Sequence, residues 1–85
     1  MKILYFAWLR EKVGCAEEDL ALPAHVRSVE GLLDWLKGRS PGHAEALADR
    51  KLVRIAVNHD YVAGDHALKP EDEVALFPPV TGGRS

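Results

Sequence analysis

The residues of this chain best suited to chemistry stand at its C-terminal end. Two adjacent glycines, Gly82 and Gly83, follow the stiff stretch "FPPVT". Because glycine has no Cβ, a partner's narrow channel can close around the bare backbone of such a segment. A carboxylate on glycine is also sterically open to attack, which suits an enzyme that activates a chain-terminal carboxylate. The competing interpretation is an ordinary frayed terminus, and the Gly-Gly pair taken alone favours it.

The other chemistry-bearing residues do not form a recognisable site. No two of the four histidines (His25, His43, His59 and His66) are four residues apart, and no cysteine stands near them at metal-ligand spacing. Aspartates accompany His59 and His66, but solvated turn residues are the favoured interpretation there over a metal site. Cys15 has no base or orienting group that the sequence identifies. We therefore expect no metal or cofactor site, and no enzyme activity of the chain by itself.

Composition and charge argue against several classes of protein. With 85 residues, 47% hydrophobic and 28% charged, the chain has the size and balance of one folded domain. Its net charge of −2, with no basic block, argues against nucleic-acid binding. The apolar run at 3–9 is too short for a signal peptide, and no stretch approaches the roughly 20 apolar residues of a membrane helix. With a single cysteine, the chain is expected to be soluble and cytoplasmic, without a membrane partner.

The hydrophobic pattern predicts a defined order of strands and helices. Strands are expected at 2–9, 18–23, 52–58, 61–62 and 72–77. A main helix is expected between Ser28, a suitable N-cap, and Gly38, and a short second helix at 44–49, after Pro41. This order describes an α+β roll of the β-grasp kind, with a mixed sheet whose first and last strands lie side by side. Pattern alone does not separate it from other rolls built of a hairpin and a helix. The domain is expected to span 1–80, followed by a flexible tail at 81–85.

Side-chain alternation leaves one face of the predicted sheet without a covering helix. Successive side chains of a strand point to opposite faces. Val53, Ile55 and Val57 should face the helix, because Arg54 and Asn58 would be costly there. The apolar residues left on the other face are Leu4, Phe6, Ala56, Ala75 and Phe77. They are either tucked under loops or form a docking surface for another protein.

Essentially the whole chain resembles one family. The run "DHALKPEDEVALFPPVTGG" is similar to the C-terminal signature of the MoaD-type sulfur carriers, the small subunits of molybdopterin synthase. The opening "KILYFAWLRE" and the middle "LVRIAVNHDYV" also match patterns of that family. The resemblance implies a ubiquitin-like β-grasp fold, which agrees with the roll expected from the pattern.

The resemblance also implies that Gly83 is the reactive end of a sulfur carrier. In this family an ATP-dependent activating enzyme adenylates the carboxylate of the last glycine. Sulfur from a persulfide donor then converts it to a thiocarboxylate. The tail enters the large subunit of molybdopterin synthase, and the sulfur passes to cyclic pyranopterin monophosphate during molybdenum cofactor biosynthesis. The chain itself would bind no cofactor, because the activating partner uses the ATP.

The family's partner contacts can be carried over by position. Phe6, Tyr61, Phe77 and Val80 would contact the large subunit, while Val80, Thr81 and Gly82 would lie in its channel. The catalytic residues would belong to the large subunit, so the carrier is a non-catalytic, sulfur-donating subunit. The assembly is expected to be a heterotetramer. Phe6 and Phe77 are residues that strand alternation had already left on the uncovered face.

Other functions with a similar terminus stay open. Related sulfur carriers serve thiazole, tRNA thiolation or cysteine synthesis, although thiazole-type carriers tend to be shorter and to lack the helical insertion at 41–49. A ubiquitin-like modifier would instead join Gly83 to lysines of target proteins, and a plain interaction module would not use its tail.

The last two residues depart from the family pattern. The chain continues beyond the second glycine with Arg84 and Ser85, so the carboxylate as written belongs to Ser85. These residues are a remnant of cloning, an extension that a peptidase removes, or the mark of an inactive carrier. The first two explanations are favoured.

Overall fold

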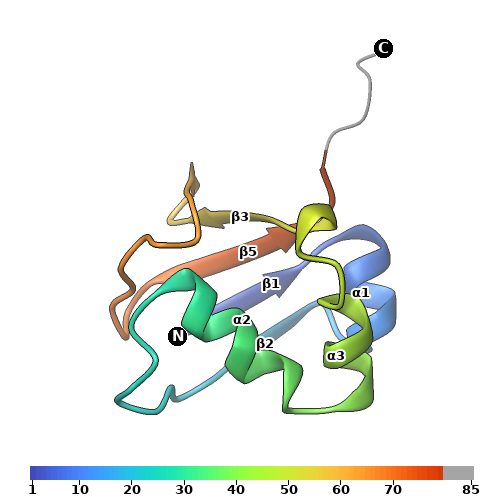
Figure 1. Ribbon diagram of the computed structural model, residues 1–85, viewed down its shortest axis with the longest axis horizontal. Helices are drawn as coiled ribbons and strands as arrows, with labels where there is room; N and C mark the ends of the chain where they lie inside the picture. Colours follow the sequence, from blue (N-terminus) through green and yellow to red (C-terminus); the bar gives the residue numbers. More distant parts are fainter. Residues whose placement is uncertain (80–85) are drawn as a thin grey trace.

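A computed structural model describes residues 1–79 and shows a mixed five-stranded sheet with helices packed on one side (Figure 1). The strands are β1 (Lys2–Tyr5), β2 (Glu17–Asp19), β3 (Arg54–Val57), β4 (Asp60–Tyr61) and β5 (Glu73–Phe77). Their spatial order is β2-β1-β5-β3-β4. β1 and β5 run parallel, and the other neighbouring strands are antiparallel. This confirms the predicted α+β roll, including the pairing of its first and last strands.

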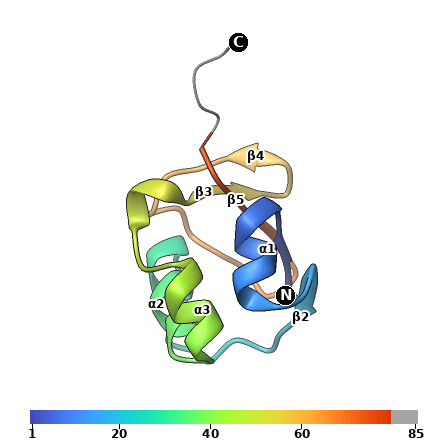
Figure 2. The same cartoon turned by 90° about the vertical axis from the view of Figure 1, so that its right-hand side faces the viewer.

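The helices are α1 (Ala7–Val13), α2 (Val29–Lys37) and α3 (Pro41–Ala46), followed by a 3-10 turn, η1 (Arg50–Leu52). Figure 2 shows α1, α2 and α3 on the same side of the sheet. The predicted main helix is confirmed as α2, whose first turn is capped by Ser28, with Oγ accepting the N–H of Gly31 at 3.2 Å. Its buried side chains are Val29, Leu32, Leu33 and Leu36. They complete a core with the inward side chains of the sheet.

The N-terminal apolar run is not one strand, and the prediction of a strand at 2–9 is wrong beyond Tyr5. Ala7 has a φ of 56°, in the left-handed region, and this residue turns the chain out of the sheet into α1. Leu9 is fully buried and Trp8 packs partly against the core. The physical reason is that a helix brings both side chains to the core, whereas strand alternation would expose one of them.

β3 lies within the strand predicted at 52–58, and β4 begins one residue before the predicted 61–62, but two other elements differ more from their predicted positions. β2 covers Glu17–Asp19 instead of 18–23, because the segment after Leu20 leaves the sheet towards Pro23. α3 begins at Pro41 and ends at Ala46, instead of spanning 44–49. The hydroxyl of Ser40 accepts the N–H of His43 at 3.1 Å, so the cap lies immediately before the proline and starts the helix there.

The inward face of the sheet agrees with the alternation argument. Val53, Ile55 and Val57 are buried, as are Val74 and Leu76 of β5. Within residues 1–79, none of the helices has the length and apolar character that a membrane crossing requires.

The close contact between α1 and α3 allows a first prediction about stability. A Cβ built on Gly42 would overlap the backbone carbonyl oxygen of Lys12, which cannot rotate away as a side chain could. We expect Gly42→Ala to lower the free energy of unfolding by about 1–3 kcal/mol, as measured by urea denaturation. Gly31→Ala is the matched control. Its Cβ would lie 3.4 Å from the Ser28 hydroxyl, and we expect it to stabilise α2 by up to about 1 kcal/mol. Equal effects of the two substitutions would contradict this account of the helix contact.

Candidate functional site

Side chains from three strands and two connecting segments form an apolar surface on the sheet face away from the helices. We call it the outer patch; it consists of Phe6, Ala56, His59, Tyr61, Ala75 and Phe77, around a hollow of about 390 Å³. The strand register explains this grouping, because Ala56 lies opposite both Tyr61 and Ala75. Residues directly opposite each other in neighbouring strands point to the same face. The rings of Tyr61 and Phe77 lie 5.5 Å apart at their centroids.

The outer patch exposes large apolar side chains to solvent. Phe6 is 47% exposed and Tyr61 is 80% exposed, while Phe77 is half-buried. No helix of residues 1–79 covers this face (Figure 2). Of the residues predicted for this face, Ala56 is buried beneath its neighbours, and Leu4 is half-buried outside the hollow. Exposed apolar patches of this kind mark interaction surfaces.

Phe6 lies on the outer patch because of the turn between β1 and α1. Its N–H donates to the carbonyl oxygen of Leu76 at 3.1 Å, which continues the pairing of β1 with β5 by one residue. Ala7 then turns the chain away, so that Phe6 is the last residue held at the sheet. The side chain is thereby fixed beside β5, the strand that ends in Phe77.

The turn between β3 and β4 brings His59 to the hollow, and sequence reasoning did not place it there. Asn58 and His59 have φ values of 51° and 74°, the positive values that a two-residue type I′ turn requires. Asparagine tolerates this conformation, but neither residue is the glycine that usually signals such a turn. The Asn58 side chain in turn holds the segment before β5, donating to Asp72 Oδ1 at 2.9 Å and accepting the N–H of Glu73 at 3.0 Å.

Asp72 is buried at the centre of these contacts. The backbone N–H of Lys69 donates to its Oδ2 at 2.8 Å, and this bond lowers the pKa of Asp72 below its usual value. Burial acts in the opposite direction, and the Asn58 bond and the Lys69 and His66 charges add to the lowering. The carboxylate therefore ties the β3–β4 turn to the loop that leads into β5.

A second prediction follows from the Asp72 contacts. We expect Asp72→Asn to lower the free energy of unfolding at neutral pH by about 1.5–3 kcal/mol, because charge-assisted hydrogen bonds are lost. A carboxylate whose pKa is lower in the folded state stabilises the fold above its unfolded pKa and loses that effect as pH falls through the folded value. The difference between variant and parent should therefore shrink below about pH 4. Urea denaturation at several pH values measures it, with the exposed Asp34→Asn as control. A constant difference down to pH 2 would contradict the assignment.

The outer patch is continuous with the start of the C-terminal segment. β5 ends at Phe77, inside the patch, and Pro78 and Pro79 follow. Two consecutive prolines favour an extended backbone. The predicted channel residues Val80, Thr81 and Gly82 and the reactive Gly83 lie outside the described residues, as does the boundary predicted at 80. The structure thus describes the predicted interface residues Phe6, Tyr61 and Phe77 and places them together.

Comparison with known proteins places this chain in a family. The family model described as the ThiS family matches residues 3–83. The chain belongs to the ThiS family. Among curated relatives, the molybdopterin synthase sulfur carrier subunit of Escherichia coli K12 is 46% identical over 83 residues, covering 98% of this chain and 99% of the relative. The human molybdopterin synthase sulfur carrier subunit is 34% identical over 86 residues, covering 98% and 93%.

Solved structures share the fold of this ThiS-family chain. A putative molybdopterin converting factor subunit 1 from Pyrococcus furiosus is 37% identical, with a TM-score of 0.75, covering 93% of this chain and 95% of that one. Small archaeal modifier protein 1 of Haloferax volcanii is 29% identical, with a TM-score of 0.74, covering 94% and 97%. These likenesses confirm the ubiquitin-like β-grasp fold.

This ThiS-family member also contains a polar cluster between β1, β2 and α3, in which Tyr5 and His43 are buried and Glu18 and Ser40 are half-buried. Glu18 Oε1 accepts the Tyr5 hydroxyl at 2.7 Å and lies 2.8 Å from Nε2 of His43, whose Nδ1 lies 2.7 Å from the Ser40 hydroxyl. Burial opposes a lower pKa for Glu18, but the Tyr5 and His43 bonds and the nearby Arg39 charge outweigh it and lower that pKa.

The order serine, histidine, glutamate in this cluster resembles a catalytic arrangement, but its other contacts indicate a structural role. Ser40 is already the cap of α3, and neither Glu18 nor His43 lines the hollow of the outer patch. Sequence analysis did not find the cluster, because Glu18 and His43 stand 25 residues apart. Within residues 1–79 no group of three or more His, Cys, Asp or Glu side chains could hold a metal ion.

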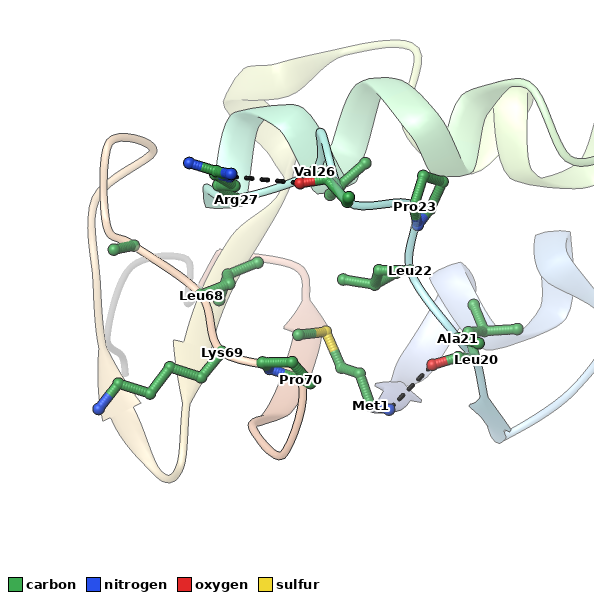
Figure 3. Close-up of a pocket in the computed structure, with 12 residues that line it drawn as sticks. Met1, Leu20, Ala21, Leu22, Pro23, Val26, Arg27, Leu68, Lys69 and Pro70 are labelled. Carbon is green, nitrogen blue, oxygen red and sulfur yellow. Dashed lines mark hydrogen bonds between the residues drawn. The ribbon is translucent and has the colours of Figure 1, made fainter.

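A second hollow, of about 430 Å³, lies at the opposite end of the sheet (Figure 3). Its apolar lining includes Met1, Leu22, Leu68 and Pro70, with Arg27 at its border. Because β1 and β5 run parallel, this end of the sheet is remote from Phe77. We therefore do not include it in the candidate site, and it offers positions for control variants.

Proposed function

We propose that this ThiS-family chain is the sulfur carrier subunit of a cytoplasmic molybdopterin synthase. The observation that carries the proposal is the continuity between the outer patch and β5. The strand that contributes Phe77 to the patch leads directly into "PPVTGG", so docking of the patch would aim the two glycines at the partner. The 46% identity to the Escherichia coli sulfur carrier subunit supports the same assignment.

The chemistry proceeds at the carboxylate of Gly83 once that residue is the chain terminus. On an activating enzyme, the carboxylate attacks the α-phosphorus of ATP and pyrophosphate leaves. The product is an acyl adenylate, in which AMP is the leaving group for the next step. The terminal sulfur of a persulfide displaces AMP, and a thiol reductant cleaves the remaining S–S bond to release the thiocarboxylate. The large subunit then passes this sulfur to cyclic pyranopterin monophosphate, and two such transfers build the dithiolene of the molybdenum cofactor.

The chain's own residues bind the large subunit and present the sulfur-bearing terminus to it. They do not catalyse the sulfur transfer. Phe6, Tyr61 and Phe77 bind the large subunit, and Val80, Thr81 and Gly82 lie in its channel. The catalytic residues belong to the large subunit, in a complex with two copies of each subunit. The described part of the chain supports this division, since no residue of its Ser–His–Glu cluster lines the hollow of the outer patch.

A second candidate is a ubiquitin-like protein modifier. It is favoured by the likeness to small archaeal modifier protein 1, with a TM-score of 0.74 at 29% identity. In that function Gly83 would form an isopeptide bond with lysines of target proteins. The identity to the Escherichia coli sulfur carrier subunit, 46%, is higher, and we favour the carrier function for that reason.

The test is reconstitution of the chain ended at Gly83 with its activating enzyme, ATP and a persulfide donor. Intact mass should show one oxygen of the protein replaced by sulfur. Addition of the large subunit and cyclic pyranopterin monophosphate should then yield molybdopterin. Covalent adducts on lysines in place of the sulfur-bearing chain would support the modifier, and sulfur incorporation without product would point to another sulfur-carrier pathway.

A further inference from the structure

Arg54 is a cation on the border of the outer patch that the proposed function has not used. It stands in β3 directly opposite Phe77 of β5. Its neighbours Val53 and Ile55 are 1% and 3% exposed and point to the core. Arg54 therefore points to the outer face with Phe77 and is itself exposed. It lines a hollow of about 330 Å³ with Ile55, Tyr61, Val62 and Phe77, two of which belong to the outer patch.

Arg54 differs from Arg39 and Arg50 in its contacts, and resembles Arg10 and Arg27 in forming no ion pair within residues 1–79. Arg39 pairs with Glu18 at 3.7 Å, and Arg50 pairs with Glu30 at 2.9 Å. In the part of the chain that the structure describes, no Asp or Glu forms an ion pair with Arg54. Its opposite neighbour on this face is an aromatic ring. In the free protein, water solvates the guanidinium.

A partner that covers Phe77 changes the solvation of Arg54. A partner that excludes water from Phe77 and Tyr61 also removes much of it from Arg54, which lines the same hollow. A charge that loses its water without gaining an opposite charge is strongly unfavourable. Arginine is nevertheless enriched in protein interfaces, because its planar guanidinium binds a carboxylate through two parallel hydrogen bonds. A partner that buries Arg54 is therefore expected to present an anion to it.

We infer that the protein that covers the outer patch supplies an aspartate or glutamate carboxylate to Arg54, beside the point where the C-terminal segment leaves β5. This inference rests on the proposed docking of the large subunit. It adds an electrostatic contact to an otherwise apolar surface. The contact fixes the orientation of the carrier on its partner. The apolar surface by itself allows several rotations of the carrier, whereas a guanidinium–carboxylate pair at the border of the surface allows only one rotation.

The test compares binding of Arg54 variants to the cognate large subunit by titration calorimetry at low and high salt. We expect Arg54→Gln to weaken binding about 30-fold and Arg54→Glu to weaken it further, since a buried carboxylate would lose its partner. Arg54→Lys should recover only part of the affinity, because lysine lacks the planar fork. The parent affinity should fall with added salt, and Arg54→Gln should reduce that dependence.

Controls separate this inference from the proposed function. Arg27→Glu reverses an exposed charge at the opposite hollow and should leave binding unchanged. If Arg54→Glu binds within twofold of the parent while Phe77→Asp binds about 100-fold more weakly, Arg54 stays solvated and the inference is wrong, although docking stands. If Phe77→Asp also binds normally, the outer patch is not the interface and both proposals fail. Thermal unfolding of each variant checks that the exposed substitutions leave the fold intact.

Discussion

Replacing Phe77 by aspartate is expected to weaken binding of the large subunit about 100-fold or more. Phe77 lines the hollow of the outer patch, where its ring centroid lies 5.5 Å from that of Tyr61. Truncating a hot-spot residue of an interface costs about 2 kcal/mol or more, and every 1.4 kcal/mol is tenfold in affinity. The substitution removes that contact and also buries a carboxylate without a partner. Calorimetric titration with the large subunit measures the loss directly.

Two further variants decide whether the effect belongs to the interface or to stability. Phe77 is half-buried, so Phe77→Asp also costs some free energy of unfolding, whereas Tyr61→Asp changes a side chain that is 80% exposed. Tyr61→Asp should therefore weaken binding without a change in the unfolding midpoint. Leu22→Asp is the matched control for stability, since Leu22 is half-buried at the opposite hollow. It should destabilise the domain and leave binding of the folded protein unchanged. Equal binding losses for Leu22→Asp and Phe77→Asp would mean that only stability was measured.

The parts of the fold that sequence predicted best are those fixed by local chemistry. Ser28 caps α2 through its own side chain, and the alternation of Val53, Ile55 and Val57 assigns the buried face of β3 without reference to the rest of the molecule. The strand–helix switch at Ala7 was not predictable in this way. The run 3–9 contains no glycine or proline to mark a boundary, and the left-handed φ of Ala7 is imposed by packing of Leu9 into the core.

The residues of the candidate site that sequence predicted are again those fixed by local pattern. Alternation identified Phe6 and Phe77 as uncovered, and the resemblance to the sulfur carriers added Tyr61. His59 and Arg54 were missed as neighbours of these residues because their positions depend on the register of β3 with β4 and β5. Alternation already placed Arg54 on the outer face, but register is a tertiary property, and it alone decides that Arg54 lies opposite Phe77.

Moving the terminal carboxylate from Gly83 by one residue inward or two residues outward is expected to abolish sulfur incorporation. A chain ended at Gly82 withdraws the carboxylate by about 3.5 Å, and a chain that keeps Arg84 and Ser85 advances it by roughly twice that. Adenylation requires the reacting atoms within about 3–3.5 Å, and a displacement of 1 Å can already cost about 100-fold. We expect no thiocarboxylate from either chain by intact mass after incubation with activating enzyme, ATP and persulfide donor. Sulfur on the chain that keeps Arg84 and Ser85 would overturn the proposed chemistry.

The same two chains should fold normally, because both keep the whole core described for residues 1–79, which runs from Ile3 to Leu76. They should also bind the large subunit through the outer patch. Varying the concentration of the large subunit therefore distinguishes a defect in docking from a defect in sulfur loading. Phe77→Asp lowers an affinity, so a large excess of large subunit should restore its sulfur transfer once the chain has been thiocarboxylated. No concentration of either partner can restore transfer by the chain ended at Gly82, because the group that carries the sulfur is out of reach of the activating enzyme.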